Sequence, residues 1–278
     1  RYEAMRRANR AWGLCGIMET HHYGFYPSFI SKLSKWSFFE PYEDMEELLQ
    51  KILVGEYGEE NLDAVSRALD LWSESVRFYT PSNADQYGAF RVGPSYPFCL
   101  TATIPIPSSP EAMFGNRICC PTYPNSADAG DSLTSIRIHE EMKSQENMLK
   151  LIHEGNLILE GAAIKNEKLL HLLNLGKFIE NTVKTGIHAK QWQVLKNRLY
   201  VSDSKMDAKL ILDEMEQLLN AEIAVAEATI PLVEADSRLG WEPSMLYMTD
   251  KWHLEWKIRQ VNYVLNVEIA EYRKSLQR

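Results

Sequence analysis

The chain has 278 residues, of which 45% are apolar and 24% charged, and its formal net charge is -8. This composition is that of an ordinary globular protein and excludes disorder over most of the length. The acidic balance argues against an affinity for phosphate backbones, and no long cluster of Lys and Arg offsets it. We therefore expect no nucleic-acid partner.

Apolar runs and cysteines limit the protein class further. No run of about 18 apolar residues is present, so we expect no membrane-spanning helix. The four cysteines, Cys15, Cys99, Cys119 and Cys120, are too few for a disulfide scaffold and show no CxxC spacing. They favour a reducing compartment, and we expect a cytoplasmic location. The motif patterns of nucleotide, metal and flavin sites are missing, and we expect no cofactor.

The first predicted region, residues 1–80, combines helices with one strand. A short apolar run at 14–18, between Gly13 and a polar cluster, predicts a buried β-strand. Four helices are expected around it, at residues 1–12, 29–38, 43–57 and 61–79.

A single strand needs a partner, because its buried backbone groups must be hydrogen-bonded. Either the partner strands lie upstream in a longer polypeptide, or the strand prediction is wrong. We favour the first alternative, because Arg1–Met5 already continue a helical pattern. This region is therefore expected to be a partial α/β segment, the end of a larger architecture.

The second predicted region, residues 81–130, holds most of the twelve prolines and several glycines. It cannot stay helical for long, so we expect an irregular loop region. Its many aromatic residues argue against a disordered linker. Loops of this length are uncommon unless they line a site or wrap another surface.

The third predicted region, residues 131–278, is a bundle of long amphipathic helices. The third helix has an apolar stripe that includes Ile211, Met215 and Leu218, and Pro231 is expected to kink it or end it early. Short connections predict antiparallel neighbours, so the fold class is mainly α. The four helices are expected at residues 131–161, 166–200, 204–235 and 249–276.

The first candidate site is the polar loop that follows the predicted strand. Side chains at the carboxyl ends of strands often line active sites in α/β folds. The alternative is a solvated, capped loop. Adjacent histidines without a third ligand argue against a metal site. The candidate substrate-binding residues here are Glu19, His21, His22, Tyr23 and Tyr26.

The second candidate site lies in residues 83–98, where aromatic residues alternate with Arg, Asn, Asp and Gln. That mixture suits a carbohydrate, because rings stack on sugars and the polar groups bind hydroxyls. A structural loop fixed by its aromatic residues is the alternative. The candidate binding residues are Tyr87, Arg91 and Tyr96.

The turn at residues 234–245 combines several charges with a Trp, and we expect it to be structural. A pair between Arg238 and either Asp236 or Glu242 is expected to hold this turn. Trp252 and Trp256 are expected in the core or at the rim of the bundle.

Two stretches resemble the end of a (β/α)8 barrel in bacterial glycoside hydrolases. The first is Gly24–Ser28, followed by a helix and then by Glu56-Tyr57-Gly58 and Trp72–Ser75, and the second is the later stretch Gln86–Pro97. The resemblance covers residues 12–100. This sequence departs from it at His21-His22-Tyr23, where such loops often present a Trp before the Gly.

The resemblance implies a C-terminal part of a carbohydrate-active protein, with catalytic residues on upstream strands of the same protein. Its expected partners are a carbohydrate and that upstream part, and the chain alone is expected to be inactive. The alternative is a self-contained helical interaction module, in which the bundle forms a homodimer or binds another protein.

Overall fold

The computed structural model describes residues 1–16, 28–39, 44–80, 89–100, 133–163, 166–240 and 249–277. Within these ranges all regular structure is helical. None of the described helices is both long and apolar enough to cross a membrane. The predicted α-helical class is therefore confirmed, whereas no strand is found in the described part of the α/β segment.

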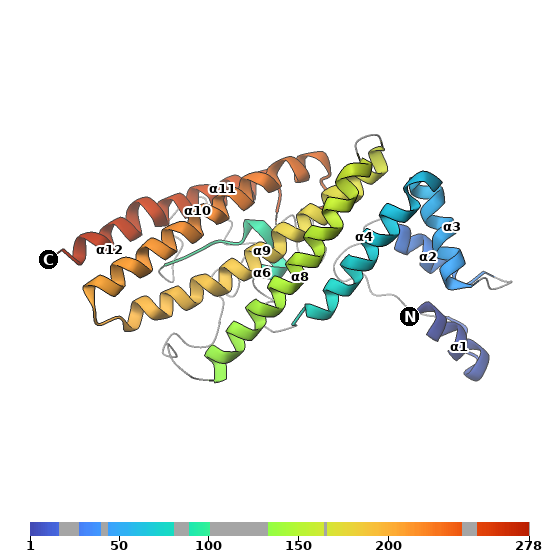
Figure 1. Cartoon of the computed structure of the whole chain (residues 1–278), viewed down its shortest axis with the longest axis horizontal. Coiled ribbons are helices and arrows are strands. Elements are labelled where there is room, and N and C mark those ends of the chain that lie inside the picture. Colours follow the sequence, from blue (N-terminus) through green and yellow to red (C-terminus); the bar gives the residue numbers. More distant parts are fainter. Residues whose placement is uncertain are drawn as a thin grey trace.

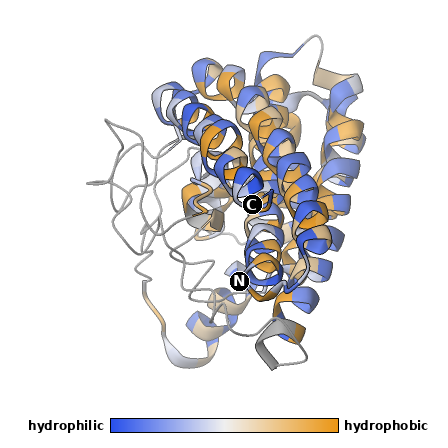
Figure 2. Ribbon diagram, turned by 90° about the vertical axis from the view of Figure 1, so that its left-hand side faces the viewer, coloured by the Kyte–Doolittle hydropathy of each residue, from blue (hydrophilic) through white to orange (hydrophobic). Residues whose placement is uncertain are grey.

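Long antiparallel helices form the C-terminal half, as predicted. They are α8 (Leu133–Ala163), α9 (Glu167–Val201), α10 (Lys205–Ala235) and α11 (Lys251–Tyr263), the last continued by the π-helical η4 (Val264–Ile269) and by α12 (Ala270–Ser275). Figure 1 shows them side by side, with the two chain termini at opposite ends of the molecule. Figure 2 shows that their hydrophobic residues gather on the faces turned toward neighbouring helices.

Side-chain caps explain where these helices begin. Asn166 accepts a hydrogen bond from the backbone N–H of Leu169 at the start of α9. Ser204 does the same for the first turn of α10, and Asp250 for α11. Each cap satisfies N–H groups that lack a partner within the helix. The predicted starts of these helices near 166, 204 and 250 are therefore confirmed.

The predicted apolar stripes form the main core. Met215 and Leu212 of α10 are fully buried, and Trp256 of α11 packs in the same cluster. Trp252 is 46% exposed, so the two tryptophans occupy core and rim as expected. Pro231 does not end α10, which continues to Ala235. Pro231 lacks the N–H that would bond to the carbonyl four residues earlier, but the helix continues for four more residues and ends where Asp236 N–H donates to Leu232 O.

The N-terminal half is a smaller set of helices. It contains α1 (Tyr2–Trp12), α2 (Phe29–Trp36), α3 (Met45–Tyr57) and α4 (Leu62–Ser75), with 3-10 turns η1 (Glu59–Asn61) and η2 (Val76–Phe78). In Figure 1, α4 lies along α8 and α2 and α3 lie beyond it. Trp72 of α4 inserts between α8 and α9 and donates its indole N–H to Ile152 O at 3.3 Å.

The described residues of the predicted strand 14–18 correct that expectation. Gly13 ends α1 in the left-handed conformation, with φ 69°. Leu14, Cys15 and Gly16 are exposed and belong to no strand, and the Leu14 carbonyl accepts a hydrogen bond from Asn9 Nδ2 at 2.7 Å. That bond is made within one turn of chain and needs no neighbouring strand. Residues 17 and 18 lie outside the described residues.

The loop region is also more ordered than predicted where it is described. Residues Ala89–Val92 form α6 and Gly93–Ser95 form the 3-10 turn η3. This segment packs on α9, behind it in the view of Figure 1. Most of residues 89–99 are buried. The chain can bury them because their polar groups find partners inside the bundle, as described below.

A buried carboxylate joins α8 to α9. Glu180 accepts hydrogen bonds from Asn156 Nδ2 and Lys184 Nζ, both at 2.7 Å, and lies 3.2 Å from His153 Nδ1. Burial by itself raises the pKa of Glu180, but Lys184, Asn156 and His153 outweigh it, so the pKa is lower than usual. The ionised carboxylate is therefore the form that the fold favours.

Acid should weaken the protein partly through Glu180. A carboxyl whose folded pKa is lowered stabilises the fold above its unfolded pKa of about 4.3, and that stability is lost as the pH falls through the folded pKa. We expect urea unfolding to show a fall in stability below about pH 5, and Glu180→Gln to reduce this fall. Lys184→Met should reduce it as well. An unchanged pH profile in both variants would contradict this role of Glu180.

Candidate functional site

The candidate site is a cleft of about 610 Å³ between η2 and the first half of α8, which we call the Tyr79 cleft. That volume is in the usual range of small-ligand sites. Its lining residues are two aromatic side chains and a set of polar ones: Phe78, Tyr79, Thr80, Arg137, Glu140, Glu141, Lys143, Ser144 and Asn147.

Packing fixes the aromatic wall of this cleft. Phe78 and Tyr79 are half-buried and pack on the cluster formed by Met148, Ile152 and their neighbours. Ser144 Oγ donates to the Phe78 carbonyl at 2.9 Å and ties η2 to α8. Tyr79 also stacks on Phe90, with ring centroids 4.8 Å apart. These contacts leave the two rings little freedom to move before a ligand arrives.

Glu141 is the most buried of the charged residues that line the Tyr79 cleft. Glu141 is only 8% exposed, and its carboxylate accepts a hydrogen bond from Arg137 Nε at 2.6 Å. The second carboxylate oxygen lies 3.9 Å from Nζ of Lys190, a fully buried lysine on α9. Two cations therefore hold the carboxylate in one orientation, in which it can accept a hydrogen bond from a ligand hydroxyl.

Thr80 carries a further sign of a ligand site. In the part of the chain that the structure describes, its Oγ1 is buried and has no hydrogen-bond partner. Native proteins rarely leave a buried hydroxyl unpaired without a water or a ligand to bind it. Thr80 is also one of the residues that line the Tyr79 cleft.

The two described carboxylates of this cleft are not placed as a catalytic pair on opposite sides of a substrate. Glu140 and Glu141 are successive residues of one helix, so their side chains do not face each other. A glycosidic bond needs two carboxyls on opposite sides of it. No group of three or more His, Cys, Asp or Glu residues able to hold a metal occurs among the described residues.

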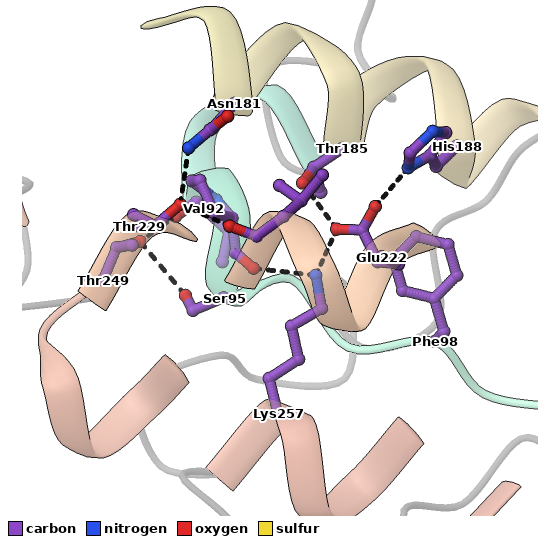
Figure 3. Close-up of polar contacts among 12 residues, drawn as sticks. Val92, Ser95, Phe98, Asn181, Thr185, His188, Glu222, Thr229, Thr249 and Lys257 are labelled. Atoms are coloured by element: carbon purple, nitrogen blue, oxygen red, sulfur yellow. Dashed lines mark hydrogen bonds and ion pairs between the residues drawn. The ribbon is translucent and has the colours of Figure 1, made fainter. Parts of the chain in front are cut away.

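A second feature, the buried polar network of Figure 3, anchors residues 92–99 inside the bundle. Lys257 of α11 is fully buried, pairs with Glu222 of α10, and donates to the Pro94 carbonyl at 2.7 Å. Glu222, also fully buried, accepts from Thr185 Oγ1 at 2.6 Å and contacts His188 Nδ1. Three helices and the segment thus meet at one ion pair.

The same network supplies hydrogen-bond partners to backbone N–H and C=O groups of residues 92–99. Gln260 binds both the N–H and the carbonyl of Phe98. Trp192 Nε1 donates to Cys99 O at 3.1 Å, and Thr249 Oγ1 donates to Val92 O at 2.5 Å. These side chains replace the hydrogen bonds that a sheet or helix would supply, which explains how an irregular segment can be buried.

The pKa values in the network favour the ionised carboxylate. Burial alone raises the pKa of Glu222, but the charges of Lys257 and His188 outweigh it, and the result lies below the usual value. Burial lowers the pKa of Lys257, and Glu222 only partly offsets this. Each charge of the pair therefore depends on the other.

The sequence-predicted site residues fall into three groups. Tyr96 is 2% exposed and packs edge-on against Phe98, so it contributes to the core. Arg91 lies on α6, and its side chain lies outside the described part. The other six predicted residues also lie outside it: Glu19, His21, His22, Tyr23, Tyr26 and Tyr87.

The predicted pair in the 234–245 turn is confirmed in one of its two forms. Arg238 donates from Nε and from an Nη to the two carboxylate oxygens of Asp236, both at 2.7 Å. Asp236 is buried, so the pair fixes the turn after α10. Glu242 lies outside the described residues.

Sequence reasoning missed the Tyr79 cleft. Phe78, Tyr79 and Thr80 come just before the Pro-rich region, and this position was the one available signal. Glu141 and Lys190 lie on different helices, and no spacing rule links them.

Comparison with known proteins adds no relative. Neither models of protein families, nor curated proteins, nor solved structures gave a significant match to this chain.

Proposed function

We propose that this chain is a helical accessory part of a carbohydrate-active protein and binds a neutral saccharide in the Tyr79 cleft. The observation that carries the proposal is the pairing of two fixed aromatic rings, Phe78 and Tyr79, with a buried and oriented carboxylate, Glu141. An aromatic surface packs on the apolar face of a sugar, and oriented polar groups bind its hydroxyls.

The charge of the cleft supports a neutral ligand. The lining contains Arg137 and Lys143 together with Glu140 and Glu141, so it carries two charges of each sign. Such a lining offers donors and acceptors without a net attraction for an ion. A hydroxyl both donates and accepts, and a saccharide presents many of them.

The bundle supports this role by holding the adjacent segment. Tyr79 stacks on Phe90, and the residues after Phe90 are anchored by Lys257, Gln260 and Trp192. The predicted binding residue Tyr87 lies between Tyr79 and Phe90 in the sequence. A rigid anchor on the side of α6 would keep Phe90, and with it the Tyr79 ring, in place beside the cleft.

Saccharide affinity should depend on Arg137. An exposed arginine that both bonds Glu141 and lines the cleft can be removed with little effect on the fold. We expect Arg137→Gln to weaken binding of a neutral oligosaccharide about tenfold or more, because a hydrogen bond to a charged group is lost and Glu141 loses its orientation. A glycan array would identify the ligand, and isothermal titration calorimetry would measure the affinity.

Matched controls separate the cleft from general effects. Arg67→Gln, an exposed arginine on α4 outside the cleft, should leave the affinity unchanged. Tyr79→Ala should abolish binding, whereas Tyr200→Ala, at a tyrosine 78% exposed on α9, should not. Binding that survives both Arg137→Gln and Tyr79→Ala in folded protein would contradict the proposal.

A second candidate function is a helical interaction module, and exposed apolar residues favour it. Tyr200, Met206 and Leu210 are each more than half exposed around the connection between α9 and α10. Grouped apolar residues of this kind often mark protein contacts. Sedimentation equilibrium distinguishes the two functions. A stable dimer that is dissociated by Leu210→Glu and binds no saccharide would favour the module.

A further inference from the structure

A second cleft, of about 270 Å³, lies where four segments distant in the sequence meet; we call it the Lys168 cleft. The first turn of α2 supplies Phe29 and Lys32, and the end of α3 supplies Glu56 and Tyr57. The first turns of α9 supply Lys168, and the turn after α10 supplies Arg238. The Lys168 cleft shares no lining residue with the Tyr79 cleft.

Positive charge predominates in the Lys168 cleft. Glu56 contacts two lysines. One of its carboxylate oxygens pairs with Lys32, and the other lies 3.5 Å from Lys168 Nζ. One carboxylate cannot neutralise both lysines. The cleft is therefore a local cationic site in a chain whose net charge is -8.

Arg238 adds a cation whose position is fixed. Asp236, which is buried, holds its guanidinium through two hydrogen bonds of 2.7 Å, while the side chain of Arg238 remains 45% exposed. The pair itself is neutral, so the lysines supply the excess charge. Arg238 provides planar N–H groups of defined orientation at the edge of the cleft.

One ring nitrogen of His171, in the same cleft, lacks a hydrogen-bond partner among the described residues. Its Nδ1 is buried and makes no hydrogen bond within the described structure, and Asp236 Oδ2 lies 3.7 Å from it. The first turn of α2 also lines the cleft, and a helix N-terminus carries partial positive charge. Together these groups form a donor-rich wall.

Part of the lining of the cleft is apolar, and we call it the apolar wall. Phe29, Leu172 and Leu175 line it, and Tyr57 lies among them. Burial raises the pKa of Tyr57, so its hydroxyl stays protonated and can donate. A bare inorganic anion would leave this apolar wall unused.

We propose that the Lys168 cleft binds a small organic anion: a carboxylate or phosphate held by Lys32 and Lys168, attached to a body the size of one sugar ring that packs on Phe29 and Leu172. The two lysines supply the charge, and the apolar wall supplies the contact for the body. This inference is independent of the saccharide proposal, because it concerns a different cleft with a different charge.

Calorimetry with four probes tests this inference on the full chain: glucuronate, glucose 6-phosphate, glucose and inorganic phosphate. Glucuronate or glucose 6-phosphate should bind with millimolar or better affinity, and affinity should fall as salt is raised. The probe that binds more tightly identifies carboxylate or phosphate as the preferred head group. Glucose and inorganic phosphate should each bind at least tenfold more weakly, because each lacks one half of the ligand.

Two variants with opposite effects make the test sharper. Lys168→Met should weaken binding of the anionic probe about tenfold, since it removes a charge-assisted contact. Glu56→Gln should strengthen binding, because it removes the carboxylate that competes for both lysines. Lys209→Met, at an exposed lysine on α10 outside the cleft, is the control and should change nothing.

Several outcomes would overturn the inference. They are equal binding of glucose and glucuronate, weaker binding after Glu56→Gln, or no detectable binding of either organic anion by folded protein. Binding of inorganic phosphate as tight as that of glucose 6-phosphate would overturn the part assigned to the apolar wall. Glucose is itself a neutral saccharide that the Tyr79 cleft is proposed to bind, so the same four probes are also titrated into the Tyr79→Ala protein, in which binding reports the Lys168 cleft.

Discussion

Replacing Lys257 with Met is expected to lower the free energy of unfolding by about 3–5 kcal/mol, because it leaves a buried carboxylate without its main partner. Both Lys257 and Glu222 are fully buried. The substitution also removes the donor to the Pro94 carbonyl, so the anchored segment loses a contact. Urea unfolding followed by circular dichroism measures the change.

Two further variants show whether the loss comes from the unpaired charge. Lys251 lies on the same helix as Lys257 and forms an exposed ion pair with Glu234 of α10, so we expect Lys251→Met to cause no measurable change. Adding Glu222→Leu to Lys257→Met should recover part of the stability, because no buried charge then remains. A Lys257→Met protein as stable as the wild type would show that the ion pair does not hold the fold.

Trp72→Ala is the substitution with the next largest expected effect, about 3 kcal/mol of destabilisation. The value is at the low end for tryptophan because part of the side chain is exposed. The indole lies against two helix glycines. A Cβ at Gly155 would lie 2.5 Å from Trp72 Nε1, and one at Gly176 would lie 2.3 Å from Trp72 Cζ2.

The glycines of α8 provide a matched pair for this contact. Gly155→Ala should destabilise the protein, because its Cβ would meet Trp72 and overpacking costs about 1–3 kcal/mol. Gly161→Ala, on the same helix, has nothing within 4 Å and should be neutral or stabilising by up to about 1 kcal/mol. If Trp72 is the obstacle, Gly155→Ala should cost less in a Trp72→Ala background. Equal effects of Gly155→Ala in both backgrounds would contradict this account.

Helices with long apolar periods could be predicted from the sequence, and their ends could be predicted from capping residues. Met215 and Leu218 repeat at helical spacing, and Ser204 and Asp250 cap the helices that follow them. Both signals come from residues that are close together in the sequence, and packing in the bundle does not override them. The pair of Asp236 and Arg238 was also predictable, because the two residues are close in the chain.

The failures have physical causes. The apolar run at 14–18 has the composition of a strand, but a strand is stabilised by neighbours that a sequence pattern does not reveal. The segment at 89–99 was expected to be irregular, and its burial depends on Lys257, Gln260 and Trp192, which lie far along the chain. The Tyr79 cleft also depends on contacts between distant helices. Such features follow from tertiary packing.

Hydrogen exchange measured with and without a neutral oligosaccharide shows whether the saccharide binds in the Tyr79 cleft. We expect slower amide exchange in residues 76–80 and 137–147 when the saccharide is present, and no such change in the Arg137→Gln protein. Protection confined to other parts of the chain, or binding that leaves both stretches unchanged, would contradict the assignment of the cleft as the saccharide site.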